Sequence, residues 1–507
     1  MNEAFLPLLV GVPLGVAGLC AMAPRGARWP LPVTFATLAG LLVAACALVA
    51  GTADGTVSAH QVSGWPGGIS IPFVVDVFSA LMLVVTGLLT LVCSWFAVVS
   101  GPGRVHLFSA FVLVLAAGVN GALLTADLFN LFVFVEVMLL PSYGLLILAE
   151  RRRGTERSVL GSRLYVAFNL FVSTLFLTGV ALVYGIAGTV NLGELAGAAR
   201  ESDGVAVATG VCLVALSMKA ATFPAYGWLA RAYPSTSPAV TALFSGLHTK
   251  VAIYAVYRIY AVVFDGDDRW LWIGLVAFTL TMVVGVLGAV GEHTTRAILA
   301  FHMVSQIGYI LLGVALFTVA GLAAGIFYLL HHMIVKASLF MSAGAVEVRS
   351  GSARLDVVAA VARREPWLAA AFAMAALSLA GLPPFSGFVA KLTIILASVD
   401  AGRPVVAAVA IAVSLLTLLS MLKIWDSLFV SAPPEPATSE HGTGGGVAVQ
   451  APARVGMALT APSLVLAVVT LGLGLGGEGL LALTGTAAEG LVDTSAYVAA
   501  VLSGGGR

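Results

Sequence analysis

The sequence has 507 residues, of which 60% are apolar and 10% charged, and its formal net charge is +1. A soluble protein of this length needs far more surface charge, and a nearly neutral chain has no electrostatic preference for nucleic acid. Apolar runs of about 18 or more residues recur along the chain, and each is long enough to cross a bilayer as a helix. A β-barrel needs alternating rather than continuous apolar residues and is excluded.

About fourteen spans are predicted, so the fold class is an all-α polytopic membrane protein. In chain order they lie near residues 4–22, 31–51, 72–100, 105–125, 127–149, 162–187, 204–230, 238–264, 271–291, 295–316, 318–345, 366–399, 403–430 and 456–480. The first span starts with Glu3 and is followed by Arg25 and Arg28, which predicts a retained helix rather than a cleaved signal peptide. Residues 431–455 predict a flexible loop rich in Pro, Gly and Ser.

Arginine predicts the orientation of these spans. Fifteen arginines follow odd-numbered spans: Arg25, Arg28, Arg104, Arg151, Arg152, Arg153, Arg157, Arg163, Arg231, Arg296, Arg349, Arg354, Arg363, Arg364 and Arg454. The loops after even-numbered spans and the C-terminal tail hold only four: Arg200, Arg269, Arg403 and Arg507. Loops rich in basic residues stay in the cytoplasm, so both termini are predicted on the outer face of the cell membrane.

An internal duplication is also indicated. The stretch Gly227–Arg231 resembles Gly387–Lys391, and Pro224 and Pro384 precede the two stretches at the same spacing. The offset of 160 residues also relates spans 4 to 8 to spans 9 to 13. Five helices reverse the direction of the chain, so the two repeats are predicted to be inverted. The predicted divisions are 1–104 for the first three helices, 105–264 and 271–430 for the repeats, and 431–507 for a loop, the last helix and the tail.

The five lysines carry most of the functional argument. The chain has twenty arginines, and its only lysines lie inside or at the edges of apolar spans: Lys219, Lys250, Lys336, Lys391 and Lys423. Arginine stays charged, whereas a buried lysine can lose its proton, so this usage predicts titrating amines in the membrane. A lysine at mid-membrane costs about 2.5–3.5 kcal/mol, which makes several of them an expensive accident. For Lys423, three residues before Asp426, a static ion pair is the preferred interpretation.

Glu136 is the matching anion within an apolar span, and Lys219 is its expected partner from another helix. Pro141 and Pro224 each follow one of these charged residues by five positions. A proline removes one backbone hydrogen bond, so helix breaks are predicted at Pro141, Pro224, Pro383 and Pro384. The alternative is that proline is simply common in membrane helices.

Four histidines, His248, His302, His331 and His332, also lie in spans or at their ends. His332 and Lys336 share a helix face, and histidine can pass protons between lysines, so His332 is a candidate site and His248 and His331 are possible relays. A packed, hydrogen-bonded histidine is the alternative. Metal binding by His331 and His332 is not favoured, because adjacent helical residues point apart and a third ligand is not evident. The four cysteines are scattered singly, so no metal or other cofactor is predicted.

The stretch from Asp127 to Tyr143 resembles a signature of the D subunit of Mrp-type multisubunit sodium/proton antiporters. Thr249-Lys250-Val251, and the run from Gly381 to Phe388 with Lys391 just beyond it, resemble the same family. The resemblance covers spans 3 to 13 and is specific at the level of a superfamily that includes antiporter-like subunits of respiratory complex I. It implies fourteen helices with inverted repeats, and a hetero-oligomer with other membrane subunits.

The resemblance also implies residue roles. Glu136 matches the family's glutamate, Lys219 and Lys391 match the two broken-helix lysines, and Lys250 matches the central lysine. His332 and Lys336 match polar positions between them. Complex I relatives usually carry His-x-Trp-Leu-Pro-Asp-Ala-His at the first broken helix, where this chain has Tyr226 to Tyr233 without that aspartate or either histidine. The departure favours the antiporter branch and puts roles borrowed from those residues in doubt.

Three functions are compared. The leading hypothesis is a subunit of a sodium/proton antiporter that moves protons along the membrane midplane and is not an enzyme itself. The second is an energy-coupling subunit of complex I or a membrane-bound hydrogenase, whose chemistry would lie in partner subunits. The third is a scaffold with static ion pairs, in which neutralising Glu136 and Lys219 together would preserve transport.

Overall fold

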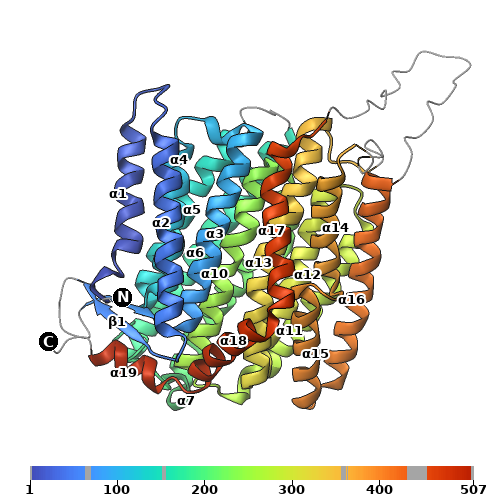
Figure 1. Ribbon diagram of the computed structural model, residues 1–507. Helices are drawn as coiled ribbons and strands as arrows, with labels where there is room; N and C mark the ends of the chain where they lie inside the picture. Colours follow the sequence, from blue (N-terminus) through green and yellow to red (C-terminus); the bar gives the residue numbers. More distant parts are fainter. Residues whose placement is uncertain are drawn as a thin grey trace, which may run out of the picture.

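The computed structural model describes residues 3–62, 70–150, 156–355, 361, 364–430 and 454–503. Within these residues, eleven helical stretches are long and apolar enough to cross a membrane, and α4 and α14 are shorter apolar helices. The helices stand side by side in one bundle, as Figure 1 shows. The class predicted from the apolar runs, a polytopic helical membrane protein, is confirmed.

The described residues of the first half of the chain form ten α-helices of very different lengths. They are α1 (Leu8–Met22), α2 (Pro30–Thr52), α3 (Val77–Ser100), α4 (Phe108–Leu124), α5 (Leu128–Glu150), α6 (Glu156–Ala187), α7 (Ala198–Glu201), α8 (Asp203–Lys219), α9 (Gly227–Ala232) and α10 (Pro238–Val263). Between α2 and α3 the strands β1 (Ser58–Gln61) and β2 (Pro72–Val75) pair antiparallel.

In the second half, the part of the chain that the structure describes adds nine α-helices. They are α11 (Leu271–Gly291), α12 (Thr295–Leu316), α13 (Val319–Ser350), α14 (Pro366–Ala380), α15 (Ser386–Asp400), α16 (Pro404–Trp425), α17 (Met457–Leu475), α18 (Gly477–Val492) and α19 (Ser495–Ser503). The predicted loop at 431–455 lies almost wholly outside the described residues. The predicted count of fourteen crossings stays a prediction, because the predicted spans near 204–230 and 366–399 are each two helices.

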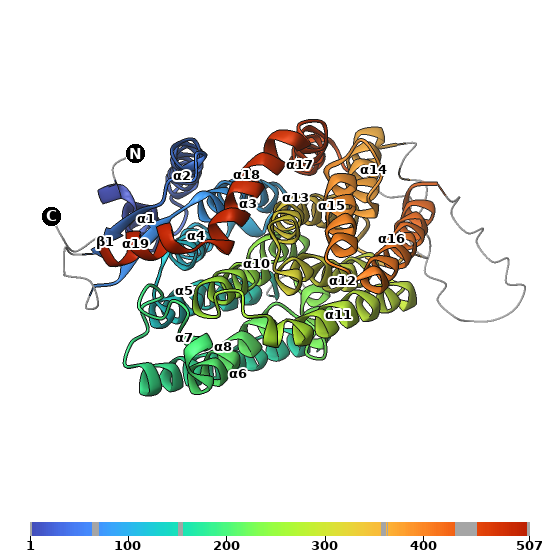
Figure 2. The same cartoon turned by 90° about the horizontal axis from the view of Figure 1, so that it is seen from below.

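The centre of the bundle is formed by α10, α12 and α13. The apolar windows of α10 and α12 are 100% and 94% buried, whereas that of α2 is 22% buried. Figure 2 places these three helices in the middle of the bundle. Two of them, α10 and α13, are the least hydropathic of the long apolar helices. The polar residues of the membrane region are therefore kept away from lipid.

Two parts of the fold differ from the sequence-based boundaries. The span predicted at 72–100 begins with β2, and its helix starts only at Val77, where Asp76 accepts a hydrogen bond from Ser79 N at 2.9 Å. Asp76 is therefore the cap of this helix. The tail carried no clear pattern, yet α18 and α19 lie across one end of the bundle, beside the β-hairpin (Figure 1).

Candidate functional site

The two interrupted spans end their first helices in the same way. In the first break, Thr222 N donates to Ser217 O at 3.1 Å and Ala221 N to Met218 O at 3.0 Å, with Ala221 at φ +66°. In the second, Leu382 N donates to Leu377 O at 3.1 Å and Gly381 N to Ser378 O at 3.0 Å, with Gly381 at φ +90°. Each pair of bonds is a Schellman motif, which closes a helix with one left-handed residue.

The predicted breaks at Pro224 and at Pro383 and Pro384 are confirmed, because these prolines lie between α8 and α9 and between α14 and α15. The predicted break at Pro141 is wrong. Helix α5 runs through Pro141 without interruption. A proline removes one hydrogen bond but does not end a helix whose neighbouring residues keep right-handed dihedral angles.

Lys219 is the last residue of α8, where helix carbonyls lack helical partners. Its ammonium group donates to Asn169 Oδ1 on α6 at 3.1 Å. Glu136 lies within electrostatic range, but the two do not form an ion pair within 4 Å in the described structure. One buried carboxyl oxygen of Glu136, Oε1, has no hydrogen-bond partner among the described residues. Glu136 and Lys219, the predicted pair, therefore lie near each other without forming an ion pair. The direct partner of the lysine is Asn169.

His248 on α10 connects this region to two further helices. Its Nδ1 lies 2.7 Å from the Tyr165 hydroxyl, and its Nε2 lies 2.8 Å from the Ser142 hydroxyl. The Ser142 hydroxyl already donates to Met138 O at 2.8 Å. His248 Nε2 must therefore carry the proton and donate to Ser142, which leaves Nδ1 to accept from Tyr165. Asn169 and Tyr165 lie one turn apart on α6, and a polar pair at this spacing in an apolar helix is the signal that would have found them.

The middle of the bundle holds Lys250, His332 and Lys336, none of them exposed. Lys250 donates to Thr249 Oγ1 at 3.0 Å, and Lys336 donates to Leu299 O of α12 at 3.0 Å. His332 lies close enough to both lysines for their charges to interact, and neither of its ring nitrogens has a hydrogen-bond partner in the described structure. The three residues come from α10 and α13, the two central helices.

Lys391 lies at the far end, in the second turn of α15. It reaches back across the break and donates to Ala380 O, the last residue of α14, at 3.0 Å. Its ammonium group also sits 5.5 Å from the centre of the Tyr309 ring. The freed carbonyls at a helix C-terminus favour a cation, so both broken helices offer a lysine the same kind of position.

His331 and His302 complete this end of the site. His331 Nδ1 lies 2.8 Å from the Ser386 hydroxyl, which is 2.6 Å from Thr470 Oγ1 on α17. His302 was noted in the sequence but not counted as a candidate. It is fully buried on α12, lies in electrostatic range of Lys336 and Lys391, and has no hydrogen-bond partner in the described residues. Its position between two lysines is a tertiary feature with no local sequence signal.

Other charges in the bundle are held rigidly. Arg258 pairs with Asp76 at 2.5 Å, and Arg296 pairs with Glu347 at 2.7 Å, all four side chains being buried or nearly so. Lys423, for which the sequence favours a static ion pair with Asp426, is half-buried and donates to Glu292 O at 2.8 Å and to Val290 O at 3.2 Å at the end of α11. Lys219, Lys250, Lys336 and Lys391 are also held by neutral amide, hydroxyl or carbonyl oxygens, but unlike Lys423 they are buried. The candidate site is thus a row of buried amines and imidazoles from α8 to α15.

Comparison with known proteins agrees with this arrangement. Residues 125–417 match the family model described as NADH:quinone oxidoreductase/Mrp antiporter, TM. The chain is 36% identical over 507 residues to the D subunit of a Na(+)/H(+) antiporter of Alkalihalophilus pseudofirmus, with 99% of each chain covered.

Two solved structures are similar along almost the whole chain. A chain of the Mrp complex from Dietzia sp. DQ12-45-1b is 56% identical with a TM-score of 0.94, covering 99% of this chain and 100% of that one. A chain of the archaeal membrane-bound sulfane sulfur reductase is 25% identical with a TM-score of 0.83, covering 98% and 99%. The chain therefore belongs to the NADH:quinone oxidoreductase/Mrp antiporter transmembrane family, and within it to the branch of the antiporter D subunits.

Proposed function

We propose that this chain is the proton-translocating subunit of a multisubunit Na+/H+ antiporter, working beside other membrane subunits as a transporter rather than an enzyme. The observation that carries the proposal is the row of buried lysines with neutral partners. An ammonium group held by a carboxylate is locked in its charged form. An amine held by a carbonyl or hydroxyl oxygen keeps a hydrogen bond in either protonation state, because a neutral amine still donates.

The proposed path runs sideways through the bundle. A proton enters at Glu136 and Lys219, passes His248 to reach Lys250, and continues through His332 and Lys336 to Lys391, with His331 beside the last lysine. Proximity supports most steps: Lys219 is in electrostatic range of Glu136 and His248, and Lys336 is in range of Lys250 and Lys391. The step from His248 to Lys250 rests only on their place two residues apart on α10. Two charged lysines repel each other across a low-dielectric interior. Protonation of one lysine therefore favours loss of the proton from the next.

The test is transport in everted membrane vesicles that contain the whole complex. Lys219→Ala is expected to abolish sodium-driven proton exchange. Lys219→Arg is expected to do the same, because a guanidinium keeps the charge but does not release its proton. Lys423→Ala is the matched control and is expected to retain exchange, since Lys423 holds only the end of α11. Undiminished exchange in Lys219→Ala would sink the proposal.

The second candidate is a membrane subunit that couples a redox reaction to proton pumping. It is favoured by the likeness to the sulfane sulfur reductase chain, which is part of a respiratory complex. The genes beside this one discriminate between the two. Small antiporter subunits support the first function, whereas NADH-oxidising or hydrogenase subunits support the second.

The proposal includes two inverted repeats, at 105–264 and 271–430, with both termini on the outer face of the cell membrane. The equivalent break residues Ala221 and Gly381 support the repeats, because 381 minus 221 is 160, the offset between Pro224 and Pro384. Each repeat would contain one half of the proton path, which we call a half-path. Because the repeats are inverted, the two half-paths run in opposite directions and meet at the central lysines.

A further inference from the structure

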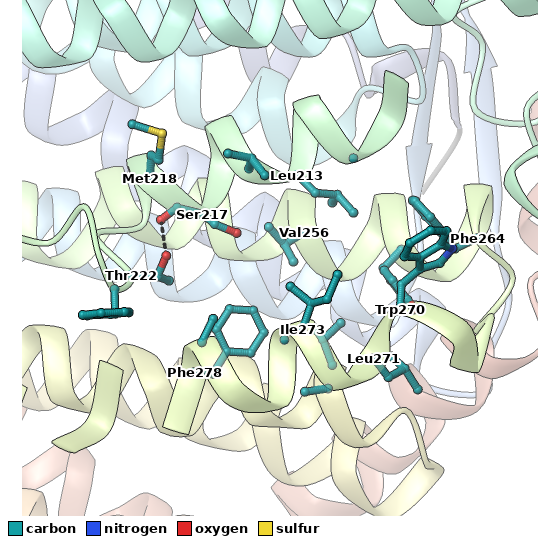
Figure 3. A pocket seen from close by; sticks show the side chains of 18 of the residues that line it. Leu213, Ser217, Met218, Thr222, Val256, Phe264, Trp270, Leu271, Ile273 and Phe278 are labelled. Atoms are coloured by element: carbon teal, nitrogen blue, oxygen red, sulfur yellow. Dashed lines mark hydrogen bonds between the residues drawn. The ribbon is translucent and has the colours of Figure 1, made fainter. Parts of the chain in front are cut away.

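An apolar groove lies on the flank of the bundle between α8, α10 and α11, as Figure 3 shows. Its volume is about 490 Å³, within the range of about 300–1,000 Å³ usual for small-molecule sites. Val207 and Val214 of α8 and Ile273 of α11 line it and are between 47% and 65% exposed. These side chains belong to membrane helices, so the groove faces lipid or a partner rather than water.

The groove offers few polar groups, and most of them are already satisfied. The Thr222 hydroxyl donates to Ser217 O at 3.0 Å (Figure 3), and the Tyr260 hydroxyl donates to Asp267 O. The exceptions among the described residues are the Ser217 hydroxyl and Trp270, which lines the groove and ends the short turn before α11. Its indole Nε1 is buried and has no acceptor among the described residues. Because this atom is buried, Trp270 offers the groove its apolar ring rather than a hydrogen-bond donor.

The end of the groove at Trp270 carries charges of both signs. Arg200 pairs with Asp265 at 2.7 Å, and Arg269 contacts Asp203 at 3.3 Å and Asp267 at 2.7 Å. The hydrogen bond from Arg269 holds the pKa of Asp267 below its usual range, so this pair is charged at neutral pH. Glu201 and Asp268 are exposed nearby, which leaves acidic groups in excess. Such a rim suits a headgroup that carries both a phosphate and an ammonium group, and it disfavours a purely anionic one.

We propose that this groove binds one acyl chain of a zwitterionic aminophospholipid. The chain fills the apolar groove and packs against the Trp270 ring, and the headgroup lies at the rim formed by Arg200, Arg269 and their aspartates. Tryptophan at the interface and a hydrocarbon chain below it are the usual arrangement of lipid at a protein surface.

The inner end of the groove reaches the break after α8. Thr222, Phe223 and Pro224 line it, and Phe223 N donates to Thr281 Oγ1 of α11 at 2.9 Å. A bound chain therefore packs against the segment that follows Lys219 and limits its movement. This consequence rests on the proposed function, whereas binding of the lipid does not.

The experiment uses the whole complex in nanodiscs containing phosphatidylethanolamine brominated on its acyl chain. Bromine quenches tryptophan fluorescence at short range, and the Trp270 signal is obtained by subtracting the spectrum of Trp270→Phe. Gly210 lines the groove and a Cβ added there meets no atom within 4 Å, so the Gly210→Phe side chain has room to enter the groove. Gly185→Phe is the matched control, because Gly185 is exposed on α6 and also has open space.

Strong quenching of Trp270 that is lost in Gly210→Phe and kept in Gly185→Phe is the expected result. Weaker quenching by brominated phosphatidylglycerol at equal content is expected as well. Equal quenching in the two glycine variants would overturn the proposal. So would no quenching of Trp270 in the wild-type complex, which is the result if a helix of another subunit covers the groove. Transport activity does not enter this readout, so a failed proton path leaves the binding result intact.

Discussion

At the scale of single residues, buried arginines are paired with carboxylates, whereas buried lysines are held by neutral oxygens. Arg258 and Arg296 are buried and paired with Asp76 and Glu347, so their charges are balanced and held in place. Breaking a buried pair costs about 3–5 kcal/mol, which makes such pairs poor proton carriers. The lysines have neutral partners instead. A sequence with twenty arginines and five lysines already predicts this division, but the neutral partners come from distant helices and were visible only in the structure.

Asn169 is the first residue to test at this scale, because it is the direct partner of Lys219. Asn169→Leu is expected to lower sodium-driven proton exchange by about tenfold, since a buried ammonium group that loses a hydrogen bond is destabilised by roughly 1–3 kcal/mol. Asn191→Leu is the control, because Asn191 accepts hydrogen bonds in the loop before α7 and does not contact the lysine. Equal exchange in the two variants would contradict the role given to Asn169.

At the scale of elements, a proline alone did not predict a break. Pro224 and Pro384 each follow a residue in the left-handed region by three positions, whereas α5 continues through Pro141. An apolar bilayer penalises any unsatisfied backbone group, so a helix persists unless a local motif takes over its last carbonyls. Gly381 could have predicted such a motif from the sequence, because glycine adopts left-handed angles easily. Ala221 could not, because alanine favours helix, and only the surrounding packing forces its left-handed angle.

Substitutions at the two break residues, Ala221 and Gly381, are expected to change stability in opposite directions. Ala221→Gly is expected to stabilise the complex by about 1 kcal/mol, because a left-handed non-glycine residue costs roughly 1–2 kcal/mol. Gly381→Ala is expected to destabilise it by a similar amount. It should also lower transport, because a Cβ at 381 would lie 2.6 Å from Lys391 Cδ and displace the lysine from Ala380 O. Thermal unfolding of the purified complex, with vesicle transport in parallel, measures both. Stabilisation by Gly381→Ala would contradict this account.

Gly387 shows a different use of glycine at the same break. A Cβ there would lie 1.6 Å from Ser378 O, so α15 can pass the end of α14 only without a side chain at this position. That close approach brings Ser386 to His331 and keeps Lys391 beside Ala380 O. The sequence matched Gly387 with Gly227 in the proposed repeat, but a Cβ at 227 meets no atom within 4 Å. The two breaks therefore share their helix-closing motif and differ in their packing.

At the scale of the whole molecule, the sequence predicted which residues are buried in the membrane. It predicted the contacts between these residues less well. The polar residues of α10 and α13 were recognisable because charge in an apolar run is costly. The groups that hold them were not, because these depend on which helices pack in the centre. The β-hairpin and the final helices were also missed. There Tyr497 of α19 lies over the Arg258 guanidinium at 4.4 Å, and Gln61 donates to Val501 O at 2.7 Å. Such contacts join distant segments and leave no periodic pattern.

Orientation is the prediction that belongs to the whole molecule. The loop between α1 and α2 lies at the end of the bundle opposite α18 and α19 (Figure 1). Fifteen arginines follow odd-numbered spans and four lie elsewhere outside the spans, so the end with α19 is expected to face outward. In intact cells, a membrane-impermeant maleimide should label Asp54→Cys and Arg403→Cys, and Arg28→Cys only after permeabilisation. These three positions are exposed, and the unaltered chain is the control because its one exposed cysteine, Cys46, lies on the apolar helix α2. The reverse labelling pattern would place the arginine-rich loops outside and reverse the assigned direction of both half-paths.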